Sequence, residues 1–181
     1  MSKLGPIGSR LIRGCDLALN ADPCSDYVPF SDGGPIVRHG DGALVSSNRP
    51  ASPGEPLSLY ALGLGFVEGT LDNALLGKAP TAPVSLKAGL QVSFSPEIAG
   101  FAAKPALAGT TGPLLVKPDF VGLIPGAVGI YQLNVTIPSD LVVTGSCYSG
   151  QGSAIISNVK IRVTGSSSLD ELGICVVANN P

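Results

Sequence analysis

The sequence has no tryptophan, a single histidine and few charged side chains, and each shortage narrows the range of functions. Of its 181 residues, 5% are aromatic and 13% are charged. Sugar-binding modules usually present flat aromatic platforms, so the lack of tryptophan counts against carbohydrate binding without excluding it. With His39 as the only histidine, a Ser-His-Asp triad or a zinc site has few ways to form.

The charged residues form no pattern typical of nucleic-acid or membrane binding. Lys and Arg number 11, they are scattered, and the net charge is −2. Without a basic stripe that alternates with aromatics, we expect no nucleic-acid partner. No apolar run approaches the ~18 residues that would span a bilayer. Residues 1–20 lack the apolar segment and cleavage site of a secretory signal. We therefore expect either a cytoplasmic protein or a mature or excised part of a longer secreted one.

Apolar residues, glycine and proline are abundant instead. The chain is 44% hydrophobic and contains 24 Gly and 16 Pro. A chain of this length can bury roughly 70% of its unfolded surface, which is enough for one core without a metal. Many chain-breaking residues among β-branched runs predict short strands joined by turns. We expect residues 1–34 to form an irregular arm or linker and residues 35–181 to form one β-sandwich domain.

Alternation of apolar and polar side chains is the main sign of strands. In Tyr131–Ile137, the residues Leu133 and Val135 would face one side and Gln132 and Asn134 the other. Such a period of two is typical of a half-buried strand with one dry face. Similar short runs predict seven to nine strands, the pattern of an antiparallel sandwich. The predicted strands cover 36–39, 43–47, 57–62, 84–95, 114–116, 120–124, 131–137, 154–163 and 173–178.

Four cysteines bear on the compartment. Among the three pairings that four cysteines allow, we favour Cys15–Cys24 and Cys147–Cys175 because of their positions in the sequence. In the chain-entropy model the second bridge would contribute roughly 3 to 4 kcal/mol. Buried free thiols are the alternative, whereas zinc would need closer cysteine pairs or more histidines. Disulfides would place the protein in an oxidising compartment.

Two segments resemble one known family. HGDGALVSSNRPASPGEPLSLYALGLG (His39–Gly65) contains a DG turn, an A-x-PGE turn and a Y-x-x-GLG strand end, and PDFVGLIPGAVGIYQLNVTIP (Pro118–Pro138) contains a PG-x-x-G-x-YQ-x-N strand. In this order the motifs resemble the uncharacterised C-terminal domain of secreted and surface proteins of Solibacter and related acidobacteria. The resemblance implies an immunoglobulin-like β-sandwich and no established activity. It covers about two thirds of the chain; the arm and the cysteines lie outside it.

Several motifs have a functional and a structural interpretation. A catalytic triad would use His39 with Asp41, but no G-x-S-x-G elbow is present, and both residues are expected to hold a hairpin turn. Gly63–Gly69 superficially resembles a dinucleotide-binding turn, yet no βαβ unit surrounds it. Acids of the arm, such as Asp22 and Asp26, could bind a cation but lack calcium-loop spacing. We predict no catalytic residue, metal site or cofactor.

These observations favour a non-catalytic structural or interaction module of a bacterial secreted or cell-surface protein. Its partner would be another protein, a neighbouring domain or a second copy, reached through the arm at an open sheet edge. The alternative is a glycan-binding module, for which Tyr27 and Tyr148 are the candidate contacts. An enzyme is not expected, because no nucleophile, base and metal set converges.

Overall fold

The computed structural model describes residues 10–11, 37–62, 64, 78–85, 89–96, 113–143, 145, 147–149, 155–164 and 171–179. Within these ranges the structure is all-β, with twelve strands and no helix. Eight strands have three or more residues, in agreement with the seven to nine expected, and four are two-residue pairings. The strands are β1 (Arg10–Leu11), β2 (Val37–His39), β3 (Pro56–Leu62), β4 (Val84–Ser85), β5 (Gln91–Ser95), β6 (Leu114–Val116), β7 (Phe120–Leu123), β8 (Ile130–Thr136), β9 (Tyr148–Ser149), β10 (Ile155–Ile156), β11 (Val159–Thr164) and β12 (Glu171–Ile174).

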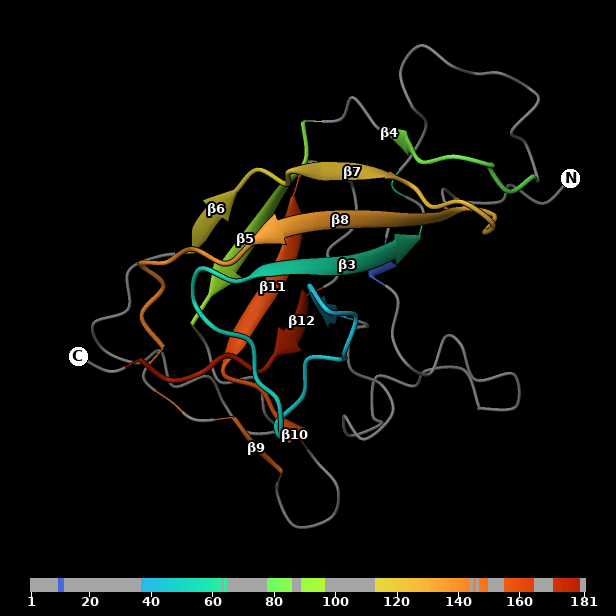
Figure 1. The fold of residues 1–181 in the computed structure, drawn as a ribbon. Helices are drawn as coiled ribbons and strands as arrows, with labels where there is room; N and C mark the ends of the chain where they lie inside the picture. The colour runs from blue at the N-terminus through green and yellow to red at the C-terminus, as the bar shows by residue number, and fades with distance from the viewer. Residues whose placement is uncertain are drawn as a thin grey trace, which may run out of the picture.

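Ten of these strands form two antiparallel sheets. The first sheet has the order β1-β3-β8-β7-β4, and β2 also pairs with β3. The second has the order β12-β11-β5-β6, while β9 and β10 form a separate two-stranded ribbon. In Figure 1, β3, β8 and β7 lie across the strands of the second sheet, which run in a different direction. The protein is therefore a two-layer β-sandwich.

The strand order is that of an immunoglobulin-like fold. Strands β2-β3-β8-β7 take the places of A-B-E-D, and β12-β11-β5-β6 take those of G-F-C-C′. The chain changes sheets between β3 and β5, returns at β7 and changes again before β11. The predicted fold class is thus confirmed. The short β4 adds one edge strand beside β7, and the β9–β10 ribbon is inserted between β8 and β11.

The inner faces of both sheets form one apolar core. In the first sheet Leu59 pairs with Leu133, and in the second Phe94 pairs with Ile161, and all four side chains are buried. Their alternation confirms the predicted period of two. Burial of a side chain of this size contributes about 1.5–3 kcal/mol. The other members are Val37, Ala51, Leu57, Ala61, Leu64, Leu90, Val92, Val121, Val135, Ile137, Leu141, Val143, Val159, Val163, Ile174 and Val176.

Four of the predicted strands differ from the structure by more than one residue. The run 43–47 forms no strand, and only Leu44 is bridged, to Arg38. The run 84–95 is two strands, because Val84–Ser85 pairs with β7 in the first sheet and Gln91–Ser95 lies in the second. The run 154–163 is interrupted at Ser157–Asn158, which separates β10 from β11. The last predicted run, 173–178, overlaps β12, which begins and ends earlier, at Glu171 and Ile174, and Val177 is exposed. Apolar alternation alone carries no information about such breaks, because it does not record which strand each run pairs with.

Asn158 joins three segments where the second sheet ends. Its amide nitrogen donates to the carbonyls of Gly145 and Val176, each at 2.6 Å, and its oxygen accepts the Val176 N–H at 2.9 Å. The side chain is buried, with 3% of its surface exposed. Close by in the sequence, a disulfide joins Cys147 to Cys175, with Cα atoms 5.4 Å apart. This is the pairing that the sequence favoured.

Candidate functional site

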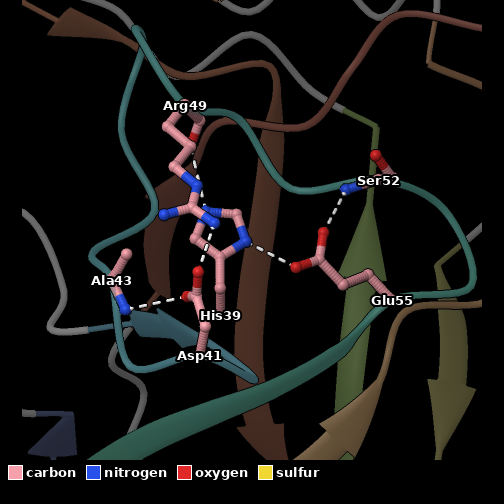
Figure 2. A network of polar contacts seen from close by, with 6 residues as sticks. All are labelled: His39, Asp41, Ala43, Arg49, Ser52 and Glu55. Atoms are coloured by element: carbon pink, nitrogen blue, oxygen red, sulfur yellow. Dashed lines mark hydrogen bonds and ion pairs between the residues drawn. The ribbon is translucent and has the colours of Figure 1, made fainter.

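His39 ends β2 and is the buried centre of a polar cluster (Figure 2). Only 6% of the residue is exposed. Nδ1 lies 2.5 Å from the Glu55 Oε1 carboxylate oxygen, and Nε2 lies 3.2 Å from the Arg49 carbonyl. The ring therefore connects the end of β2 to two later parts of the chain. A buried imidazole with both nitrogens facing partners meets the usual requirement for a polar group in a core.

Asp41 pairs with Arg49 and the adjacent backbone. Its Oδ2 accepts a hydrogen bond from Arg49 Nη2 at 2.6 Å, and its Oδ1 accepts the Ala43 N–H at 3.1 Å. The hydrogen bonds from Arg49 and then from the Ala43 backbone hold the pKa of Asp41 below its ordinary value. Gly42 follows with φ +84°, a conformation that a side chain would strain. Asp41 thus holds the hairpin turn, as the sequence predicted.

Glu55 connects His39 to the turn that precedes β3. Residues 52–55 form a turn closed by the Glu55 N–H and the Ser52 carbonyl at 3.0 Å, with Gly54 at φ +82°. Proline and then glycine at the two central positions are what a type II turn requires. The Glu55 side chain returns to the same turn, where Oε2 accepts the Ser52 N–H at 2.8 Å. One carboxylate therefore orders the turn and holds the His39 ring.

This cluster has the geometry of a structural network. A triad would need His39 to be oriented by Asp41, but the ring pairs with Glu55, and the Asp41 carboxylate pairs with Arg49. No pairing between His39 and Asp41 is found, so the triad interpretation has no support among these contacts. The network instead joins the two turns that carry the DG and PGE motifs.

A second polar group lies on the outer face of the first sheet. Ser58, Gln132 and Asn134 alternate with the buried leucines and valines of β3 and β8, so they point away from the core. Gln132 Nε2 donates to Asn134 Oδ1 at 2.6 Å, and Ser58 Oγ donates to the same oxygen at 3.1 Å. We name this group the amide ladder. The sequence predicts only that Gln132 and Asn134 share the polar face of their strand.

Phe120 lies next to the amide ladder and separates two hollows of the surface. It pairs with Asn134 across β7 and β8. A hollow of about 240 Å³ is lined by Phe120, Pro83, Pro125, Gln132 and Asn134, among others. A smaller one of about 160 Å³ lies on the side of Lys117 and Asp119, and Phe120 also lines it.

Gly122 allows the Phe120 ring to occupy this position. The two residues are on the same face of β7, and a Cβ at position 122 would approach Phe120 Cζ to 2.6 Å and would also collide with the Val84 carbonyl group. Such contacts are closer than Cβ atoms tolerate. The glycine therefore serves the close approach of the ring and of β4, a known role of glycine within strands. Nothing in the sequence pattern marked Phe120 as a surface residue beside a hollow.

The other predicted site residues have mixed outcomes. Cys147 and Cys175 form the disulfide described above, whereas Cys15, Cys24 and Tyr27 lie outside the described residues. Tyr148 is in β9, paired with Ile156, and its side chain is not among those described. In the part of the chain that the structure describes, no group of three or more His, Cys, Asp or Glu could hold a metal ion. No helix long and apolar enough to cross a membrane occurs in that part either.

Comparison with known proteins gives no relative. No family model matches the sequence, and neither a curated protein nor a solved structure is significantly similar to it. The class of protein rests on the fold, an immunoglobulin-like β-sandwich with two antiparallel sheets.

Proposed function

We propose that the chain is a non-catalytic module of a bacterial secreted or surface protein, with a structural or interaction role. The closed core and the self-contained His39 network support a scaffold, because the charged groups of the network serve the chain's own turns. The Cys147–Cys175 disulfide supports an oxidising compartment. The motif resemblance to the Solibacter C-terminal domain would fit this role, since its turns coincide with the DG and PGE turns of the structure.

The observation that carries the interaction role is the pairing of β1. Arg10 and Leu11 belong to the N-terminal arm, and they pair antiparallel with Leu62 and Ala61 at the end of β3. β2 uses the same edge of β3 further back, at residues 57–59. The arm thus brings a strand to an open sheet edge, the mode by which extended segments add to sheets. Residues 12–36 lie between β1 and β2 in the sequence. A connection of this length would also allow β1 of one copy to pair with β3 of a second copy.

Deleting residues 1–34 tests the proposal. We expect the full chain to self-associate in sedimentation velocity as its concentration rises, and the deleted chain to stay monomeric and folded. A matched pair of variants isolates β1. Leu11→Pro removes a backbone donor within the strand, whereas Ala21→Pro changes the arm at a position outside it. Leu11→Pro should behave like the deletion, and Ala21→Pro like the unaltered chain. An identical mass for the full and the shortened chain at all concentrations would refute arm-mediated assembly.

A further inference from the structure

The hollow beside Phe120 combines an apolar floor with amide groups. Phe120, Pro83 and Pro125 supply apolar surface, and Gln132 and Asn134 line the same hollow. None of the lining residues named here is charged. A ligand with one apolar face and several hydroxyl groups suits such a surface, because aromatic rings bind flat C–H faces and amides bind hydroxyls.

The amide ladder leaves hydrogen-bonding groups for a ligand. Within the ladder, the Asn134 oxygen accepts from both Gln132 and Ser58, which uses its two lone pairs. Among hydrogen bonds between described residues, none involves the Gln132 side-chain oxygen or the Asn134 side-chain nitrogen. One acceptor and two donors therefore stand next to each other at the hollow. Adjacent hydroxyls of a sugar both donate and accept, so they match this pair.

The site is also fixed in position before any ligand binds. Gly122 lets the Phe120 ring lie across β7, and the ladder fixes the amides through hydrogen bonds between two neighbouring strands. Side chains that are ordered in advance lose little entropy on binding. The volume of about 240 Å³ lies below the range of roughly 300–1,000 Å³ typical of drug-sized ligands, so one sugar ring is the size expected.

We propose that the surface formed by Phe120, Gln132 and Asn134 binds one ring of a neutral saccharide. The ring stacks on Phe120, and its hydroxyls bond to the Gln132 oxygen and the Asn134 amide nitrogen. The site lies on β7 and β8 and differs from the tyrosines that the sequence suggested. It gives the module a ligand in addition to a protein partner.

The full chain, ¹⁵N-labelled, is titrated with a panel of neutral oligosaccharides after a screen on a printed glycan array. We expect at least one neutral glycan to shift the side-chain amide resonances of Gln132 and Asn134. Phe120→Ala should weaken this binding about tenfold, the loss expected for one stacked ring. Asn134→Leu, of similar volume, should weaken binding as well. Because it changes a different residue of the site, it tests the proposal even if Phe120→Ala fails to fold. Leu115→Ala is the matched control, because Leu115 is exposed on the other sheet.

The proposal is overturned if no neutral glycan binds, or if both site variants bind as well as the control. Binding of short proline-rich peptides to the same resonances, without any glycan response, would also overturn it and would identify a peptide groove instead. None of these results depends on the arm, so they are separate from the outcome of the deletion experiment.

Discussion

Asn158 gives the sharpest test of how the end of the second sheet is held. The variant Asn158→Ala removes three hydrogen bonds at once. The buried N–H and carbonyl of Val176 and the half-buried carbonyl of Gly145 then lose their Asn158 partner. An orphaned buried group costs about 1–3 kcal/mol. The alanine side chain leaves space in which the carbonyls can move, so the loss is smaller than the sum of three separate costs. We expect the free energy of unfolding to fall by about 3 kcal/mol.

Asn179 provides a matched comparison for this loss. Its side chain also bridges backbone groups, accepting the Val143 N–H at 2.7 Å and donating to the Leu141 carbonyl at 2.8 Å. The residue itself is exposed, so water can replace these bonds in Asn179→Ala. We expect that variant to lose about 1 kcal/mol or less.

Equilibrium unfolding in urea measures both losses. Far-UV circular dichroism is the suitable signal because the chain has no tryptophan. The reasoning is refuted if Asn158→Ala is no more destabilising than Asn179→Ala with unchanged slopes of the unfolding transition. That result would mean that Asn158 is open to water and does not hold Gly145 and Val176 together.

Three further predictions concern the polar cluster and the disulfide. Glu55→Ala should lower the free energy of unfolding by about 2 kcal/mol, because the His39 ring and the Ser52 N–H lose their acceptor. Glu55→Gln should lower it less. Equal losses for the two variants in urea unfolding would contradict this. Arg49→Ala should raise the pKa of Asp41 toward its ordinary value in an NMR titration, since Arg49 is the main cause of the lowered value. The Asp41 contribution to stability is present above the ordinary pKa and is lost as the pH falls through the lowered one; an unchanged titration would show that the pair does not form. Reducing the Cys147–Cys175 bridge should cost roughly 3–4 kcal/mol, measured by unfolding with and without reductant, and an unchanged midpoint would contradict it.

The sequence was sufficient for the fold class because the strong strands carry their own signal. Leu133 and Val135 alternate with amides, and the type II turn at Pro53–Gly54 follows directly from its two residues. The break between β4 and β5 could not be predicted, because both runs contain apolar residues and only long-range pairing assigns them to different sheets.

The candidate sites depend on contacts between distant positions. His39 and Glu55 are 16 residues apart and meet only when β2 pairs with β3. The amide ladder joins Ser58 to Asn134 across 76 residues, and Phe120 reaches it through the register of β7 and β8. Such neighbours are set by strand register, which composition and local pattern leave open. For that reason the sequence directed attention to tyrosines and missed Phe120.

The order of the first sheet is the claim on which both proposals depend, and NMR contacts along β8 test it most directly. The account predicts backbone NOEs from Leu133 to Leu59 on one side and to Val121 on the other. Contacts of Leu133 with backbone of β5 or β11, in place of these two, would contradict the immunoglobulin-like order and remove the surface beside Phe120.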